Sequence, residues 1–137
     1  MSDTGLRPLP SGGFAASAEL VTAEEDWRQS SRHQLHYIDT GLLIIELARS
    51  AWYVFPGRAA WVSANVHHRA LIKQPTRLRT VYLPRETMLG PLPDCATLSP
   101  APLARDMTDY ALRFGSDRSD DARADRFFCA LADMARD

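Results

Sequence analysis

Turn-forming residues recur at short intervals along the middle of this chain and divide its apolar pattern into short pieces. They stand at Asp39-Thr40-Gly41, Ala48-Arg49-Ser50, Pro56-Gly57, Ser63-Ala64-Asn65 and Gln74-Pro75-Thr76. Such residues supply the positive or fixed φ angles that tight turns need. The strands expected around them are Phe14–Val21, Gln34–Asp39, Leu42–Leu47, Ala51–Phe55, Ala59–Val62, Val66–Ile72, Leu78–Leu83 and Cys95–Leu98. Many short strands at close spacing predict a β-sandwich or barrel.

Composition limits the classes of protein to which the chain can belong. Its 137 residues suit one domain with one substantial core. Sixteen basic and seventeen acidic residues give a formal net charge of −1, so no sequence-wide field attracts nucleic acid or an anionic membrane. We therefore expect no direct DNA binding by these residues. The longest apolar stretch, Gly41–Leu47, is far shorter than the roughly 20 residues that span a bilayer, which predicts no membrane insertion.

Cysteine usage and the start of the chain indicate a compartment. Cys95 and Cys129 have no CxxC partner, and residues 1–13 contain no apolar run typical of a signal peptide. These features predict a reduced, cytoplasmic protein. The same 13 residues combine Pro and Gly without periodicity, and we expect them to form a flexible arm.

The pattern changes from strands to helices after residue 98. An apolar stripe that includes Leu103, Met107 and Tyr110 has helical spacing, and it predicts a helix over Pro102–Phe114. A second helix is expected after Ser119, whose side chain can cap it. The sequence therefore predicts a β-domain over residues 14–98 and a helical annex over residues 99–137.

Two strand-turn-strand fragments carry residues that packing alone does not explain. The first is Gln34-Leu35-His36-Tyr37-Ile38-Asp39-Thr40-Gly41, and the second runs from Pro56-Gly57-Arg58-Ala59 through Trp61-Val62 to His68. Together they resemble the two signature motifs of the cupin fold, and their particular residues are similar to those in the sensor domain of AraC-type transcription regulators. The resemblance implies a mainly β cupin barrel (a double-stranded β-helix, jelly-roll-like) with two C-terminal α-helices. It further implies a homodimer that binds a small-molecule effector and controls a helix-turn-helix DNA-binding domain, which these residues do not contain.

The metal ligands of the cupin motifs are largely replaced in this chain. Arg28 and Ser30 stand where the first motif has its two histidines, while Gln34 and His68 match the remaining positions. A catalytic zinc or iron site ordinarily needs three His or carboxylate ligands. We expect no metal and no other cofactor, and a site rebuilt from His36 and His68, with Gln34, is the only alternative.

Strand alternation predicts which side chains face the interior. If Gln34 points inward, so does His36, and if His68 points inward, then the adjacent His67 points outward. The predicted ligand-binding residues are Gln34, His36, Arg58, Trp61 and His68. Two of them have structural alternatives: Arg58 could pair with Glu46 or Asp39, and Trp61 could fill a core.

The helical annex has two interpretations. Its stripes could simply cover the barrel of the same chain, or they could pair two subunits, as the resemblance implies. The predicted dimerisation residues are Leu103, Met107, Phe127, Phe128 and Leu131.

The inventory of reactive residues argues against catalysis. No Ser or Cys stands in a nucleophile signature, and no phosphate-binding glycine loop is present. We therefore expect an effector-binding domain and not an enzyme. The alternatives are a stand-alone cupin enzyme, such as an isomerase or oxygenase, and a ligand-free dimerising protein whose interior is filled by Ile38, Ile45, Val62 and Ile72.

Overall fold

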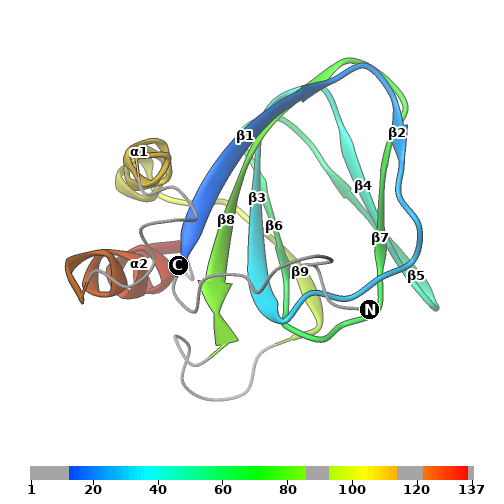
Figure 1. The fold of residues 1–137 in the computed structure, drawn as a ribbon. Helices are drawn as coiled ribbons and strands as arrows, with labels where there is room; N and C mark the ends of the chain where they lie inside the picture. Colours follow the sequence, from blue (N-terminus) through cyan, green and yellow to red (C-terminus); the bar gives the residue numbers. More distant parts are fainter. Residues whose placement is uncertain (1–12, 86–92, 114–121, 136–137) are drawn as a thin grey trace.

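The computed structural model describes residues 13–85, 93–113 and 122–135, which form two antiparallel sheets and two helices. The first sheet has the strand order β1 (Phe14–Leu20), β8 (Thr76–Pro84), β3 (Arg32–Thr40), β6 (Ala59–Val62) and β9 (Cys95–Leu98). The second sheet has the order β2 (Ala23–Glu24), β7 (Arg69–Ile72), β4 (Leu43–Leu47) and β5 (Ser50–Val54). Helices α1 (Pro102–Ala111) and α2 (Ala122–Ala135) lie on the outer side of the first sheet, away from the second (Figure 1).

The two sheets face each other without closing into the barrel that the sequence predicted. No strand of the first sheet is paired with a strand of the second. At one side the sheets are connected only by the chain itself, which runs from β1 in the first sheet to β2 in the second. At the other side, β5 lies near β9 but is not paired with it. The two facing antiparallel sheets therefore agree with the predicted jelly-roll-like fold, but the prediction of a closed barrel was wrong.

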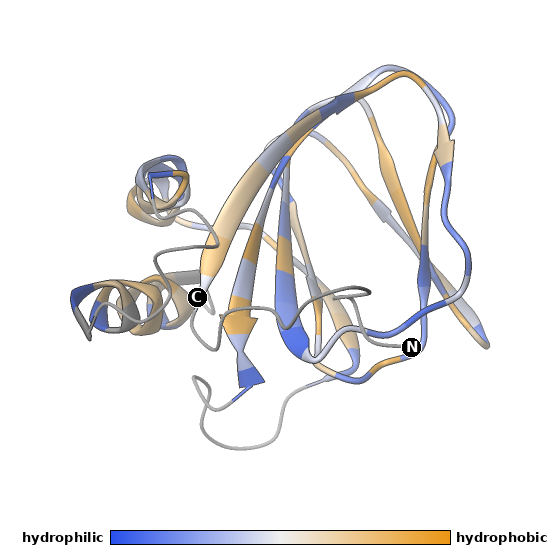
Figure 2. Cartoon of the chain, in the orientation of Figure 1, coloured by the Kyte–Doolittle hydropathy of each residue, from blue (hydrophilic) through white to orange (hydrophobic). Residues whose placement is uncertain are grey.

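Alternation along the strands produces two separate cores, one on each face of the first sheet. The core between the sheets consists of Ile38, Leu43, Ile45, Val54, Ala60, Val62, Ile72, Leu78 and Cys95. The core under the helices contains Ala15, Leu35, Tyr37, Ala59, Trp61, Val81, Leu83, Ala111, Ala124, Phe128, Leu131 and Ala132. Successive residues of a strand therefore serve different cores, as the period of two requires. Figure 2 shows apolar residues along the strands and on both helices.

The predicted turns have the backbone angles that their residues allow. Gly41 has a φ of +93° and Asn65 a φ of 65°, both in the left-handed region. A Cβ at Gly41 would also collide with Thr76, whose hydroxyl accepts a hydrogen bond from the Leu42 backbone amide at 3.1 Å. Gly41 is therefore required both by the turn and by the close approach of a second chain segment.

Two predicted elements differ from the structure, and β2 was not predicted. The expected strand Val66–Ile72 begins only at Arg69, because the left-handed Asn65 and a hydrogen bond from the Val66 amide to the Ser63 carbonyl make the preceding segment a turn. Helix α1 ends at Ala111, and the predicted helix end at Phe114 lies outside the described residues. The predicted cap Ser119 and the arm over residues 1–12 also lie outside them.

Helix α1 buries a different face from the one its large apolar residues suggested. Its buried residues are Ala104, Thr108 and Ala111, while Leu103 is 55% exposed and Tyr110 is 45% exposed. Small side chains let the helix approach the sheet closely, and the Thr108 hydroxyl donates a hydrogen bond to the Ala104 carbonyl at 2.9 Å. In the part of the chain described here, no helix is both long and apolar enough to cross a membrane.

Candidate functional site

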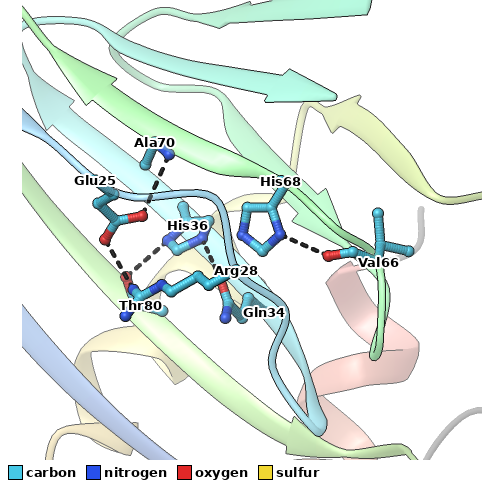
Figure 3. Close-up of polar contacts among 8 residues, drawn as sticks. All are labelled: Glu25, Arg28, Gln34, His36, Val66, His68, Ala70 and Thr80. Atoms are coloured by element: carbon cyan, nitrogen blue, oxygen red, sulfur yellow. Dashed lines mark hydrogen bonds and ion pairs between the residues drawn. The ribbon is translucent and has the colours of Figure 1, made fainter. Parts of the chain in front are cut away.

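A cluster of polar side chains lies in the otherwise apolar space between the two sheets. Gln34 and His36 project from β3, Thr80 from the neighbouring strand β8, and His68 from the segment that enters β7; all four are buried. Figure 3 shows the two imidazole rings beside each other, with Gln34 next to His36. Strand alternation had predicted that Gln34, His36 and His68 share this interior, and the structure brings them together.

Both ring nitrogens of His36 have hydrogen-bond partners. Nε2 lies 2.9 Å from the amide oxygen of Gln34, which can only accept, so Nε2 carries the proton. Nδ1 lies 2.8 Å from the Thr80 hydroxyl and accepts its proton. Burial lowers the pKa of His36 to about 3, with nearby His68 and Arg28 adding smaller effects in the same direction. His36 is therefore a neutral imidazole whose tautomer is fixed by its neighbours.

His68 retains one ring nitrogen that no described residue engages. Its Nδ1 donates to the Val66 carbonyl at 2.8 Å, which leaves Nε2 as an acceptor. Burial also lowers the pKa of His68, although the hydrogen bond to Val66 and the nearby carboxylate of Glu25 oppose the shift. The exposed His67 points away and contacts Trp27, as alternation predicted.

The segment before β3 brings a charged pair to the same cluster. Arg28 and His68 exchange two backbone hydrogen bonds of 2.9 Å, which tie this segment to the entrance of β7. The Arg28 guanidinium pairs with Glu25 at 2.8 Å, and the second oxygen of Glu25 accepts from the Ala70 amide at 3.2 Å. Figure 3 shows Arg28 extending beside both imidazoles.

Sequence reasoning did not assign Thr80, Arg28 or Glu25 to this site. Thr80 could have been found because it lies on the same face of its strand as the core residue Leu78. The place of Arg28 and Glu25 follows from a loop that pairs with a segment 40 residues further along the chain, and no local pattern predicts such pairing.

The cluster does not fit a metal ion. A ligand needs a free lone pair, and both nitrogens of His36 are engaged by Gln34 and Thr80. Among the described residues, no group of three His, Cys, Asp or Glu side chains is placed to hold a metal. The pair His36 and His68, which the sequence left as the one alternative metal site, offers a single uncommitted nitrogen.

Two predicted ligand-binding residues lie away from the cluster. Trp61 packs in the core under the helices, and its Nε1 donates to the Ser63 hydroxyl at 2.8 Å. Arg58 stands at a turn and donates from Nε to the Leu98 carbonyl at 3.1 Å. Its alternative partners Glu46 and Asp39 are paired with other arginines. The structure therefore gives both residues structural contacts outside the interior site.

The predicted dimerisation residues are divided between the surface and the core. Phe128 and Leu131 are 1% and 0% exposed and lie in the core of their own chain. Met107 and Phe127 are partly buried against the same core, and Leu103 is exposed. A second subunit could contact Leu103 and the outer edge of Phe127, but not Phe128 or Leu131 in this arrangement.

Comparison with known proteins rests on structure alone. No protein-family model and no curated protein sequence matches the chain. The EutQ protein of Clostridium difficile superposes with a TM-score of 0.50 at 12% identity, over 55% of this chain and 59% of that one. A putative ethanolamine utilization protein Q from Salmonella typhimurium LT2 gives a TM-score of 0.50 at 12% identity, over 55% and 60%. The superposed part thus spans less than two thirds of either protein.

Other solved structures carry a family description. A cupin-2 domain containing protein from Shewanella frigidimarina matches with a TM-score of 0.49 at 12% identity, over 53% of this chain and 71% of that one. Cupin-domain proteins are among the structural neighbours of this chain. Identities this low concern the fold alone. Nothing in these matches links the chain to transcription regulators, so that part of the sequence resemblance stays a prediction.

Proposed function

We propose that this chain is a non-catalytic domain that binds a small molecule between its two sheets. The observation that carries the proposal is Nε2 of His68, an acceptor on a side chain that is 2% exposed, which no described residue engages and which lies beside a cluster of hydrogen-bonded polar groups. A ligand hydroxyl could donate to this nitrogen. Arg28 extends from the same cluster toward Glu25, with which it pairs at 2.8 Å, and its guanidinium would favour a ligand that also carries a carbonyl or carboxylate oxygen.

We propose that the chain is not an enzyme because of the protonation and hydrogen bonding of its candidate reactive groups. His36 is held neutral, and neither of its nitrogens is free to accept or donate a further proton. Burial raises the pKa of Cys95 to about 12, with Asp94 as a smaller contribution, so its thiolate is not formed near neutral pH. These features support a binding site with fixed hydrogen-bonding groups and not an acid-base pair.

A sensor role needs a route from the site to a second surface. On β3, His36 faces the interior, while its neighbours Leu35 and Tyr37 lie in the core under the helices. A ligand that binds one arrangement of β3 more tightly would thereby favour one position of the helices. Control of a DNA-binding domain, as in AraC-type regulators, is the form of output that the sequence resemblance implies.

The proposed interior site can be tested by replacing His68 and, as a control, its neighbour His67. We expect one class among sugars, aromatic acids and small carboxylic acids to raise the melting temperature of the wild-type chain at millimolar concentration. His68→Phe should abolish this shift because it removes the free acceptor nitrogen, whereas His67→Phe, on the opposite face, should retain it. A His68→Phe protein that is folded and stabilised as strongly as the wild type would contradict the proposal, as would a wild type that no class stabilises.

We further propose that the exposed side of the helices pairs two subunits. Leu103 is 55% exposed and lies on the helix that also exposes Tyr110, whose ring is 5.3 Å from that of Phe127. Leu103→Glu should convert a dimer to a monomer in sedimentation experiments, because it places a charge on this exposed apolar surface. Val21→Glu, at an exposed site between β1 and β2, is the control and should leave the dimer intact. A wild-type chain that is monomeric at all micromolar concentrations would refute the pairing.

A further inference from the structure

A cavity lies on the outer face of the first sheet, beside α1. It has a volume of about 730 Å³ and is lined by residues of β1, β3, β8 and α1. Its charged lining residues are Glu19, Asp39, Arg77, Arg79, Arg105, Asp106 and Asp109. The volume is within the range of roughly 300–1,000 Å³ typical of small-molecule sites. We refer to this cavity as the outer groove.

Most charges of the outer groove neutralise one another. Arg77 pairs with Glu19 at 2.9 Å, an exposed pair across β1 and β8. Arg79 binds the carboxylate of Asp39 with two nitrogens at 2.8 and 3.1 Å, and its third nitrogen lies 3.7 Å from Asp109. Arg79 is nearly buried, and its bidentate contact with Asp39 holds its guanidinium in one position at the bottom of the outer groove.

Two opposite charges of the outer groove remain uncommitted. Neither the guanidinium of Arg105 nor the carboxylate of Asp106 forms an ion pair with any residue that the structure describes. They follow each other on α1 and both line the cavity. The groove therefore presents one cation and one anion that have no ion-pair partner among the described residues.

A buried hydroxyl lies beside Arg105. The ring of Tyr37 has the guanidinium carbons of Arg79 and Arg105 at 5.1 and 6.0 Å from its centre. Tyr37 is 1% exposed, and its hydroxyl has no well-aligned hydrogen bond among the described residues, although the Arg105 guanidinium interacts with it. A ligand anion at Arg105 would therefore bind close to a buried hydroxyl that still has capacity for a hydrogen bond.

We propose that the outer groove binds a zwitterion, either a free amino acid or a short peptide. Its carboxylate would pair with Arg105 near the Tyr37 hydroxyl, and its ammonium group would face Asp106 and Asp109. A simple anion is disfavoured because the lining contains four carboxylates against three arginines. A simple cation would leave Arg105 unpaired. Only a ligand with both charges complements both free groups.

This site is distinct from the interior site, although both use the same two strands. His36 and Thr80 face the interior, whereas on the opposite face Tyr37 lies in the core under the helices and Arg79 lines the outer groove. The proposal does not depend on what binds between the sheets. A His68→Phe variant should therefore bind the zwitterion as the wild type does, which separates the two proposals experimentally.

The experiment is a calorimetric titration of the full chain with each common amino acid, with alanyl-alanine, and with acetate and ethylamine as single-charge probes. We expect at least one zwitterion to bind about tenfold or more tightly than either single-charge probe. Arg105→Gln and Asp106→Asn should each weaken this binding by about tenfold or more. Arg113→Gln is the control, because Arg113 stacks on Tyr110 at 5.1 Å and does not line the cavity.

Each result decides between named outcomes. Tight binding of an amino acid and not of alanyl-alanine identifies a free amino acid as the ligand, and the reverse identifies a peptide. Acetate that binds as tightly as the best zwitterion would overturn the proposal. So would an unchanged affinity in Arg105→Gln, or a wild-type chain that binds none of the zwitterions at millimolar concentration.

Discussion

Replacing Phe128 by alanine is expected to lower the free energy of unfolding by about 3–5 kcal/mol, the range for removing a buried aromatic ring from a core. Phe128 is 1% exposed and lies in the core that joins α2 to the first sheet. A Cβ added at Gly13 would lie only 2.8 Å from the Phe128 ring, so the site is tightly filled on the side of β1 as well. Because a domain of this size is stable by about 5–15 kcal/mol, the loss would leave it marginal.

The adjacent residue supplies the control for this prediction. Phe127 is only partly buried, and its ring contacts Tyr110 and Phe128 at 5.3 and 5.4 Å. Phe127→Ala should cost much less, because its ring is already partly in water. Equilibrium denaturation in urea measures both changes, and Phe128→Leu serves as a milder variant if the alanine protein does not fold. Equal losses at the two positions would contradict the placement of α2.

This pair of phenylalanines illustrates what the sequence could and could not predict about the helices. The apolar stripe correctly predicted α2 and included both rings, but helical spacing alone does not tell which ring meets the sheet. On α1 the stripe that includes Leu103 left open whether it covers the sheet or pairs two subunits, and in the structure Ala104 and Thr108 are the residues that meet the sheet. The rotation of a helix on a sheet depends on how closely side chains allow it to approach, which is a property of both surfaces.

The strands were predicted more accurately than the helices because a period of two leaves only two choices for each side chain. Turn residues fixed the limits of the segments, and alternation then placed Gln34, His36 and His68 in one interior. Thr80 on β8, the hydrogen-bond partner of His36, lies 44 residues further along the chain. The sequence of neither strand alone determines the register in which two such distant strands pair. The outer groove was not predicted, because it arises where α1 lies over β1 and β8.

The stability of this chain is expected to fall by about 2 kcal/mol between pH 7 and pH 5 through His36 alone. In the unfolded chain His36 has the ordinary pKa of 6.5, whereas in the folded chain burial lowers the pKa to about 3. The unfolded state therefore binds a proton as the pH falls below 6.5, and the folded state does so only near pH 3. The stabilisation is fully present above pH 6.5 and is lost progressively as the pH falls from 6.5 to 3. His68, whose pKa is also lowered, acts in the same direction.

The measurement is the free energy of unfolding in urea at pH 7, 6 and 5, for the wild type and for His36→Gln. Glutamine keeps a polar side chain near Gln34 and Thr80 but does not titrate, so the variant should lose most of the slope even though it is less stable at pH 7. Subtracting the two curves removes the contribution of carboxylates common to both proteins. His67→Gln, which removes an exposed histidine outside the cluster, should keep the wild-type slope. A histidine that takes up a proton equally in the folded and unfolded states contributes no pH dependence to stability. If His36→Gln also kept the wild-type slope, His36 would not be the neutral, doubly hydrogen-bonded imidazole on which the interior site depends.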